Sequence, residues 1–454
     1  MNAALIEKYG NARLPRYTSY PTAPLFSDTV GARQAADWLR DLAPEETSLY
    51  IHIPYCRAMC WYCGCHTTVS HRDEPIRNYL RLLQQEIAIV TGLKRGARSD
   101  ERIAIAELHF GGGTPTVVAP QDFVGLMETV RSAFDLQPEC SVSVEIDPRT
   151  MTAEMADALA ASGVNRASLG VQSFDPIVQR AINRIQPPEL TALTADRLRA
   201  RGITALNVDL IYGLPLQTVR SCIETAEEAM AMRPEQVSVF GYAHVPSFKK
   251  HQRLIRDKDL PDAWERGEQA QAIAQTLISA GYEAVGLDHF ALPDAPIAVA
   301  ARTGRLHRNF QGYTTDACRN MIGLGASSIS RFVQGYVQNE VPIGAYARQI
   351  SQGELAKTRG YALTEEDRMR AEIIERLMCD FDVDLEPIAL EHGFDPQGLV
   401  RGNARLRALE ADGVLAIDGA RLRVAKDTRF MVRAVAAAFD AYLQVPAATY
   451  SKTA

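Results

Sequence analysis

Four of the eight cysteines of this chain lie within ten residues, in the segment Cys56-Arg-Ala-Met-Cys60-Trp-Tyr-Cys63-Gly-Cys65. Cysteine sulfur is the soft ligand that iron–sulfur clusters require. Ordinary 4Fe–4S electron carriers use four cysteines, so a cluster held by Cys56, Cys60 and Cys63 alone would keep one iron open. An open metal position distinguishes a catalytic site from a structural one. This spacing predicts catalysis at an iron–sulfur cluster.

Zinc is the alternative ligand for this segment, because zinc sites built from four cysteines are common. Such sites, however, usually join two Cys-x(2–4)-Cys pairs that lie far apart in the sequence. The other cysteines, at positions 140, 222, 318 and 379, are all solitary. The spacing therefore favours an iron–sulfur cluster over zinc.

Length and composition bound the class of protein. A chain of 454 residues predicts two or three domains, and a net charge of −6 gives no support for a nucleic-acid or anionic-membrane surface. No apolar stretch approaches the roughly 18 residues that span a bilayer, and the N-terminus does not resemble a signal peptide. Crowded cysteines in a long chain do not indicate disulfides. We expect a cytoplasmic protein that binds neither nucleic acid nor membrane.

The elements that must position the cysteines alternate between strand and helix. Helical periodicity is clearest in 75–91, where apolar residues recur every three or four positions. Six such β/α units imply a parallel sheet, either open and doubly wound or closed into a barrel. In both cases the carboxyl ends of the strands line the site. The predicted strands are 48–53, 105–110, 142–147, 167–171, 205–212 and 236–243.

Polar residues gather where these strands end. Tyr50 and His52 share one face of the first strand by period-2 alternation, and Glu145 shares a face with a second carboxylate two residues later. The glycine-rich loop 111–115 allows a ligand to approach the backbone but lacks the Lys-Ser/Thr of a phosphate-binding loop. Asp209 lies in an apolar strand and needs a ligand or a buried partner. Satisfied core polar groups, a salt-bridged strand end and a tight turn are the alternative interpretations.

Segments on either side of the β/α units complete the organisation. Residues 15–22 contain two prolines and no period, which predicts an extended arm. Residues 302–308 carry three arginines and a histidine, and arginine pairs bidentately with carboxylates, although a polar loop between domains is the alternative. A capping box at Thr364–Asp367 and an Asp418-Gly419 hairpin indicate a final helical, winged-helix-like module. The predicted divisions are 1–45, 46–300, 301–360 and 361–454.

The motifs together resemble a known family. The Cys-x3-Cys-x2-Cys spacing, with Tyr62 before the third cysteine, is similar to the signature of radical S-adenosylmethionine (radical SAM) enzymes. Gly64-Cys65, the arm 15–22 and the phrase 304–315 narrow the resemblance to the oxygen-independent coproporphyrinogen III oxidases. The resemblance runs from Pro15 to the C-terminal hairpin. It implies an α/β fold: an incomplete (β/α)6 TIM-like barrel with an N-terminal arm, a substrate-contacting connection and a C-terminal, mainly helical, winged-helix-like domain.

The resemblance also implies cofactors and site residues. It implies one 4Fe–4S cluster on Cys56, Cys60 and Cys63, with S-adenosylmethionine on the open iron, and two S-adenosylmethionine molecules in all. Cys65, Tyr50 and His52 are then catalytic. The implied cofactor contacts are Tyr50, Tyr62, Gly112, Gly113, Thr114, Glu145, Gln172, Arg184, Asp209, Ala243 and Ile329. The implied substrate contacts are Arg16, Tyr17, Tyr20, Arg302, Arg305, His307 and Arg308.

The implied activity is a step of haem biosynthesis. Two propionate side chains of coproporphyrinogen III are decarboxylated without oxygen to vinyl groups, giving protoporphyrinogen IX. A 5′-deoxyadenosyl radical would take a hydrogen from the β-carbon of each propionate, and carbon dioxide and one electron would then leave. A flavodoxin-like or ferredoxin-like electron donor and a monomeric enzyme are also implied. Many family members carry asparagine where Gly241 stands.

Three other classes are weighed against this hypothesis. A radical SAM haem chaperone would not decarboxylate, and Cys65, the arm 15–22 and the phrase 305–315 argue against it. A haem-degrading radical SAM methyltransferase would differ in the mass of its product. An iron–sulfur electron carrier would have no use for the contacts predicted at 112–114 and Glu145.

Overall fold

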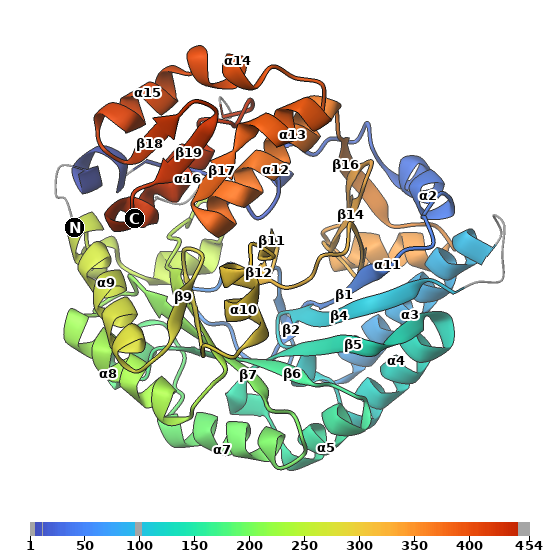
Figure 1. Cartoon of the computed structure of the whole chain (residues 1–454). Coiled ribbons are helices and arrows are strands. Elements are labelled where there is room, and N and C mark those ends of the chain that lie inside the picture. Colours follow the sequence, from blue (N-terminus) through green and yellow to red (C-terminus); the bar gives the residue numbers. More distant parts are fainter. Residues whose placement is uncertain (1–4, 11, 96–101, 444–454) are drawn as a thin grey trace.

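The computed structural model describes residues 5–10, 12–95 and 102–443. Its centre is a 12-stranded sheet in the order β16-β15-β14-β13-β1-β4-β5-β6-β7-β8-β10-β9. The six strands from β1 to β8 are parallel and follow one another in sequence order, as predicted (Figure 1). They are β1 (Thr47–Ile53), β4 (Ala104–Gly112), β5 (Asp135–Ile146), β6 (Arg166–Gln172), β7 (Ala205–Tyr212) and β8 (Gln236–Gly241).

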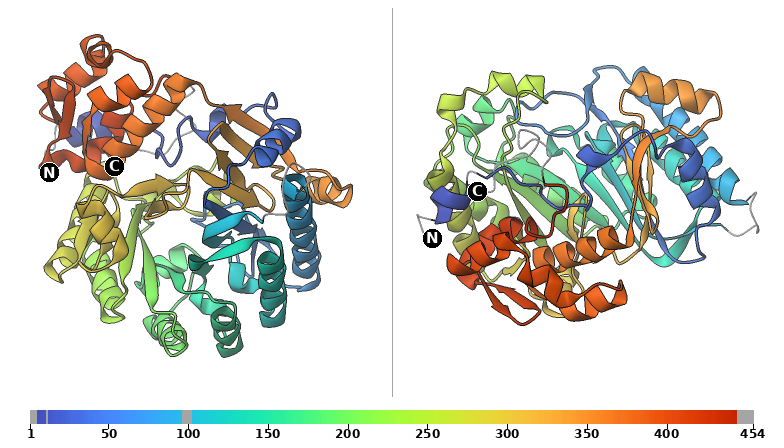
Figure 2. Two further views of the ribbon diagram at one scale, coloured as in Figure 1. Left: turned by 45° about the vertical axis from the view of Figure 1, so that its right-hand side comes forward. Right: turned by 90° about the horizontal axis from the view of Figure 1, so that it is seen from above.

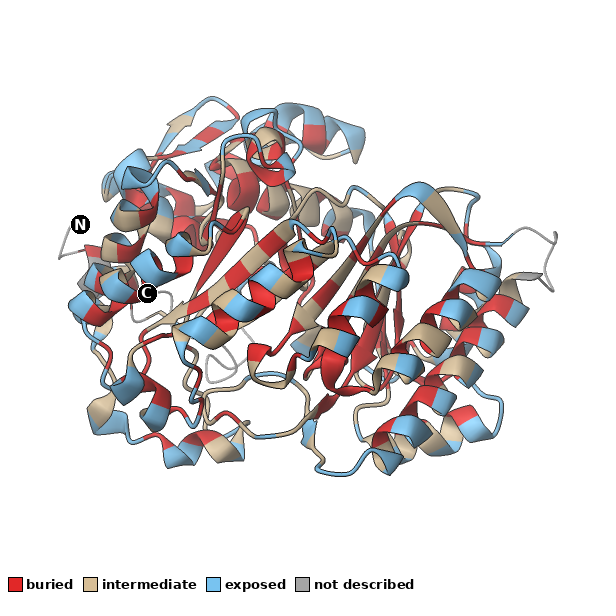
Figure 3. Ribbon diagram, turned by 90° about the horizontal axis from the view of Figure 1, so that it is seen from below, coloured by how far each residue is buried: buried red, intermediate tan, exposed pale blue. Residues whose placement is uncertain are grey.

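Helices cover the outer face of these strands (Figure 1). Several begin at a proline, whose missing N–H costs nothing in the first helical turn. Figure 3 shows their buried residues facing the sheet and their exposed residues facing outward. The helices are α3 (Glu74–Arg95), α4 (Pro120–Ala133), α5 (Ala153–Ala161), α6 (Pro176–Ala181), α7 (Pro188–Arg199), α8 (Val219–Ala231) and α9 (Ala263–Ser279).

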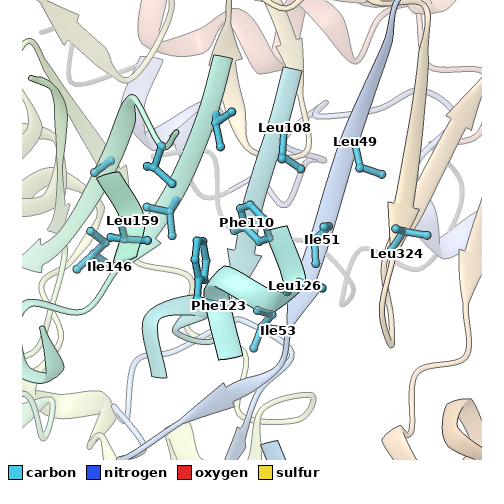
Figure 4. Packing of buried hydrophobic residues seen from close by; sticks show 14 of the residues in the cluster. Leu49, Ile51, Ile53, Leu108, Phe110, Phe123, Leu126, Ile146, Leu159 and Leu324 are labelled. Atoms are coloured by element: carbon cyan, nitrogen blue, oxygen red, sulfur yellow. The ribbon is translucent and has the colours of Figure 1, made fainter. Parts of the chain in front are cut away.

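The hydrophobic core lies between this outer face and the helices (Figure 4). Leu49, Ile51 and Ile53 alternate with Tyr50 and His52 along β1, so the apolar residues point to the helices and the polar ones to the inside. Phe110 on β4 and Phe123 on α4 are fully buried, with ring centroids 5.0 Å apart. Truncating either to alanine would cost roughly 3–5 kcal/mol. The alternation leaves a polar interior, which encloses a cavity of ≈ 250 Å³.

The sheet continues beyond the parallel strands on both sides. Next to β1 lie β13 (Asn320–Leu324), β14 (Ile329–Phe332), β15 (Gly335–Asn339) and β16 (Lys357–Ala362), with α11 (Ile343–Ser351) between the last two. Next to β8 lie β10 (His289–Ala291) and β9 (Glu283–Val285). The order ends at β16 and β9, which makes the barrel incomplete and confirms the expected fold class. The boundary drawn at residue 300 divides residues that share this one sheet.

The N-terminal arm and the C-terminal segment pack on each other. Leu5, Tyr17 and Tyr20 belong to the same hydrophobic cluster as the C-terminal helices. The predicted capping box is present, because Thr364 Oγ1 accepts from Asp367 N at 3.1 Å and Asp367 Oδ2 accepts from Thr364 N at 3.0 Å. In Figures 1 and 2 the C-terminal segment lies across the open side of the sheet. Its elements are α12 (Glu365–Asp380), β17 (Asp382–Asp384), α13 (Leu385–Glu391), α14 (Pro396–Arg401), α15 (Ala404–Ala411), β18 (Leu415–Asp418), β19 (Arg421–Val424) and α16 (Val432–Ala436).

Shorter elements complete the described chain. Helix α2 (Ala32–Arg40) follows the arm, and α10 (Pro296–Arg302) precedes the hairpin of β11 (His307–Asn309) and β12 (Gly312–Thr314). The cysteine segment begins on β2 (Tyr55–Cys56), which pairs with β3 (Thr68–Val69). Over the described ranges, we find no helix whose length and apolar character would suit a membrane span.

Candidate active site

A cavity of ≈ 600 Å³ opens at the carboxyl ends of the parallel strands, beside the cysteine segment. We call it the cluster cavity. Residues that were predicted from separate sequence motifs lie together on its wall. This was expected, because the carboxyl ends of parallel strands meet at one edge of the sheet. These are Arg16, Cys56, Cys60, Tyr62, Cys63, Cys65, Gly112, Gly113, Thr114, Glu145, Gln172, Arg184, Asp209 and Ala243.

The cysteine segment is fixed by hydrogen bonds to its backbone from other parts of the chain. Lys249 Nζ donates to Cys65 O at 2.9 Å, and His251 Nε2 donates to Cys63 O at 2.7 Å. Gln252 Nε2 donates to Tyr62 O at 2.9 Å, and Asn183 Nδ2 donates to Met59 O at 2.8 Å. Residues 249–252 follow the last parallel strand and resemble an ordinary charged loop, so the sequence did not indicate this role.

The sulfur atoms lie among donors and cations. Cys60 Sγ accepts from Arg149 Nη2 at 3.3 Å and from Arg184 Nη1 at 3.5 Å. A hydrogen bond from Cys65 lowers the pKa of Cys63 to about 6, although burial acts in the opposite direction. Burial raises the pKa of Cys56, and the neighbouring Cys63 and Cys60 raise it further. All three thiols line the cluster cavity, and the guanidinium groups of Arg149 and Arg184 lie beside Cys60.

Zinc and an iron–sulfur cluster require different arrangements of the donor atoms. Within the described part of the chain, no three His, Cys, Asp or Glu side chains are close enough to hold one metal ion. A 4Fe–4S cluster differs from zinc because each cysteine binds a different iron, so its ligands surround the cluster without meeting at a point. The donor set around the cluster cavity fits an iron–sulfur cluster.

The glycine-rich loop exposes its main chain to the cavity, because its glycines carry no side chain. Gly112 has φ +123, and a Cβ there would lie 2.9 Å from the carbonyl oxygen of Ile53. A Cβ at Gly113 would lie 2.6 Å from the carbonyl oxygen of Tyr55. Both distances are below van der Waals contact, so glycine is required at each position. Gly112 N donates to Glu145 Oε2 at 3.1 Å, which orients this carboxylate at the end of β5.

Tyr50 and His52 lie behind the glycine loop and not on the cavity wall. His52 Nε2 donates to His66 O at 3.1 Å, so its Nδ1 accepts from Tyr50 Oη at 2.9 Å. Burial lowers the pKa of His52 to about 4, which keeps the ring neutral at pH 7. Burial raises the pKa of Tyr50 well above its usual value. The pair forms a neutral hydrogen-bond chain that supports the loop.

A buried ion-pair network joins the third and fourth strand ends. Arg184 is 5% exposed, and its two terminal nitrogens donate to Asp147 at 3.2 and 3.3 Å. Arg184 Nη2 also donates to Gly170 O at 2.6 Å. Burial acts to raise the pKa of Asp147, but Arg184 and Arg149 outweigh it and hold the pKa below its usual value. Arg149 was not predicted from the sequence. Its position two residues after Asp147 could have indicated an ion pair with this carboxylate.

Two further predicted cofactor contacts, Gln172 and Asp209, are constrained by the backbone conformation or by hydrogen bonds. Gln172 adopts φ 74 at the end of β6, a left-handed conformation that is uncommon outside glycine and clusters at functional sites. Asp209 accepts from Ser168 Oγ at 2.7 Å and from Asn207 Nδ2 at 2.8 Å, and burial raises its pKa. Ile329 begins β14 and does not line the cluster cavity.

The predicted substrate residues separate into groups. Arg16 reaches the cluster cavity from the arm, where its Nη2 donates to Gly241 O at 2.8 Å. Tyr17 and Tyr20 pack against the C-terminal segment, with Tyr17 Oη donating to Asp440 at 3.0 Å. His307 lies 3.2 Å from Glu375, and Arg308 is buried beside it. Arg302, which pairs with Glu283, and Arg305 are exposed and line none of the cavities described here.

Comparisons with known proteins agree with this geometry. Residues 50–229 match the family model of the Radical SAM superfamily, and residues 363–429 match that of the HemN C-terminal domain. The chain is 55% identical to the oxygen-independent coproporphyrinogen III oxidase of Bradyrhizobium diazoefficiens, with 98% of each chain covered. It is 38% identical to that of Escherichia coli K12, with 97% of this chain and 95% of the other covered.

A solved structure extends the similarity to three dimensions. Coproporphyrinogen III oxidase (HemN) from Escherichia coli, described as a radical SAM enzyme, superposes with a TM-score of 0.89 at 36% identity. The match covers 97% of this chain and 99% of that one. Similarity over the full length, in sequence and in structure, shows that this chain belongs to the oxygen-independent coproporphyrinogen III oxidase family of radical SAM enzymes.

Proposed function

We propose that the chain decarboxylates two propionates of coproporphyrinogen III to vinyl groups without oxygen, giving protoporphyrinogen IX. One observation carries the proposal: the radical SAM residues and Cys65 meet on one cavity in a chain that is 55% identical to an enzyme of this name. When bound, the cluster and S-adenosylmethionine supply the 5′-deoxyadenosyl radical that takes a hydrogen from the β-carbon. The propionate then loses carbon dioxide, and the remaining electron passes to an external one-electron acceptor, which leaves the vinyl group.

Cys56, Cys60 and Cys63 are the proposed cluster ligands. Arg149 and Arg184 donate to Cys60 Sγ and so orient this side chain at the cavity wall. Cys65 is exposed to the cavity and donates to Cys63, which supports a role beside the cluster and not as a ligand. We assign Cys65 to catalysis, with Tyr50 and His52 supporting the loop opposite.

The chain positions S-adenosylmethionine through backbone and carboxylate groups. Gly112, Gly113 and Thr114 lie within reach of a ligand next to Cys56, and Glu145 is held beside them. Two S-adenosylmethionine molecules are proposed because two propionates react. Five further predicted contacts, Tyr62, Gln172, Arg184, Asp209 and Ala243, line the same cavity. The contact predicted for Ile329, with the second molecule, rests on the resemblance alone.

Partners and location complete the proposal. A flavodoxin-like or ferredoxin-like donor of low potential would deliver the electron needed for each S-adenosylmethionine. All eight cysteines are free, which suits a reducing cytoplasm. A monomer is expected from the resemblance.

An anaerobic assay tests the activity. The purified protein is reconstituted with iron and sulfide, reduced, and given S-adenosylmethionine and coproporphyrinogen III, and the products are measured by mass spectrometry. We expect loss of two carboxyl groups together with 5′-deoxyadenosine, and Cys65→Ser should abolish decarboxylation. Deoxyadenosine formed without decarboxylation would contradict the substrate and favour a chaperone or methyltransferase of the same superfamily.

A further inference from the structure

A second cavity, of ≈ 440 Å³, adjoins the cluster cavity. It lies between the ends of β7 and β8, helix α9, the N-terminal arm and the C-terminal segment. We call it the arginine cavity. Arg16, Gly241 and Tyr242 line both cavities, so the two share a wall at the end of β8.

Four guanidinium groups from four distant segments line the arginine cavity: Arg16, Arg266, Arg308 and Arg433. Three of them donate hydrogen bonds to backbone carbonyls. Arg16 Nη2 donates to Gly241 O at 2.8 Å, Arg266 Nη1 to Tyr242 O at 3.1 Å and Arg433 Nε to Pro15 O at 3.0 Å. A carbonyl orients a guanidinium without neutralising its charge.

The charged side chains that line this cavity are mostly cationic. Arg308 and Arg433 are buried and Arg266 is half-buried, whereas Asp288 is the one half-buried acid among the described lining residues. Exposed Lys426 and Asp427 offset each other at the rim. Burial, followed by the charge of Arg16, lowers the pKa of Arg433 to about 9. Cations therefore outnumber acids among the described side chains that line this cavity, which suits an anionic ligand.

Arg308 has side-chain donors without a hydrogen-bond partner among the described residues. Its side chain is 5% exposed, and its Nε and Nη1 have no hydrogen-bond partner within the described chain. Nη1 lies 3.9 Å from Asp288 Oδ1, which itself accepts from His289 Nδ1 at 2.8 Å. The guanidinium carbon stacks 4.3 Å from the ring centroid of Tyr313, which holds the group in place. The free donors of Arg308 suit a carboxylate.

Another cavity, of ≈ 660 Å³, borders the C-terminal segment, but it differs in two ways. Its five arginines face four acids, so its charges nearly balance. None of its lining residues also lines the cluster cavity. A substrate that must reach the cluster cavity is therefore better served by the arginine cavity.

We propose that the arginine cavity binds the carboxylates of the two propionates that do not react. This inference rests on the proposed function, since a tetrapyrrole with four propionates presents two to the cluster cavity and must place the others elsewhere. Arginine forks bind carboxylates bidentately, and four of them suit two carboxylates. Of these arginines, Arg16 and Arg308 belong to the predicted substrate contacts, while Arg266 and Arg433 come from the structure.

Gly241 lies in the wall that the two cavities share, where there is no room for a side chain. A Cβ at this position would lie 2.9 Å from Tyr212 Oη and 3.1 Å from Arg266 Nη2. Any side chain would therefore displace Tyr212 or Arg266. Glycine at this position leaves the Arg266 guanidinium at the junction of the two cavities.

Binding calorimetry tests the proposal without turnover. The reconstituted protein is titrated anaerobically, without reductant, with coproporphyrinogen III and with mesoporphyrinogen IX, which has only the two non-reacting propionates. We expect Arg266→Gln and Arg16→Gln each to weaken both ligands about tenfold or more, from the loss of charged hydrogen bonds. Arg266→Lys should recover part of the loss. Arg220→Gln is the matched control, because Arg220 is exposed on α8 and pairs only with Glu224 among the contacts described for its side chain.

The outcomes separate the two proposals. If neither variant changes the dissociation constants, if only coproporphyrinogen is weakened, or if the wild type binds neither ligand, the arginine cavity does not hold the non-reacting propionates. If the wild type binds both ligands and the variants weaken both, the cavity assignment stands even where the activity assay shows no decarboxylation. Arg16→Gln keeps the test valid if Arg266→Gln fails to fold, because Arg16 is exposed on the arm.

Discussion

The cluster cavity and the arginine cavity share a wall, yet they are assembled in opposite ways. The first takes its proposed metal ligands from one ten-residue segment and most other groups from the ends of consecutive strands. The second takes one arginine each from the arm, α9, β11 and α16. Bond-breaking chemistry is thus encoded in contiguous motifs, whereas the proposed recognition of the substrate depends on how distant segments pack.

The largest expected effect is the loss of the function assigned to the cluster cavity while substrate binding in the arginine cavity is kept. Cys60→Ser removes a proposed cluster ligand, so we expect no bound 4Fe–4S cluster and no decarboxylation, measured by iron content, visible absorbance and product mass. Binding of coproporphyrinogen III should stay within about threefold of wild type, since the arginines are untouched.

Cys318→Ser is the control for this substitution, because Cys318 lies outside both cavities and should retain the cluster. If Cys60→Ser abolished tetrapyrrole binding as well, the two cavities would not act independently and the comparison would fail.

A pH dependence of stability is expected on the cluster side. Because burial lowers the pKa of His52 to about 4 from an unfolded value of about 6.5, the unfolded state binds the extra proton between these pH values. Stability from this histidine is present above pH 6.5 and is lost as the pH falls toward 4. Between pH 7 and pH 5 we expect a loss of about 2 kcal/mol from this group in urea unfolding.

His52→Gln should lack this part of the acid dependence while the remaining dependence persists. Equal pH profiles for the variant and the wild type would show that His52 is not held neutral behind the glycine loop.

The smallest expected effect concerns the shared wall. Gly241→Ala introduces a Cβ against Tyr212 and Arg266, and we expect it to weaken coproporphyrinogen binding about fivefold through overpacking. In an Arg266→Gln background the same change should weaken binding less, because the clash is relieved. Strictly additive effects in this double-mutant cycle would mean that Gly241 does not act through Arg266.

The fold was largely predictable because its patterns are local. Short apolar, β-rich runs between helical segments located the parallel strands, and the parallel arrangement then required their carboxyl ends to meet. The capping box at Thr364 and the hairpin at Gly419 are also short-range signals, and both are confirmed. The extension of the sheet through β13–β16 was not predicted, since pairing of Thr47 with Asn320 depends on contacts that are distant in sequence.

The site shows the same division. Arg266 occupies a charged helix and resembles a solvated residue in sequence, and Arg433 follows the C-terminal hairpin without any motif. Only the packing of α9 and α16 against the arm reveals that both face one cavity. Conversely, the cluster of cations at 302–308 did not indicate which side chains point into a cavity. Of its three arginines, the structure places only Arg308 on a cavity wall.

The bonds from Asn183, Lys249, His251 and Gln252 to the cysteine segment have a consequence for maintenance of the enzyme. These donors form hydrogen bonds with main-chain carbonyls, so the backbone conformation of the segment does not depend on sulfur–iron bonds. When oxygen destroys a cluster, the protein should persist as a folded scaffold with its thiols still arranged. We therefore expect iron, sulfide and reductant to rebuild the cluster in the folded protein without unfolding and refolding of the chain.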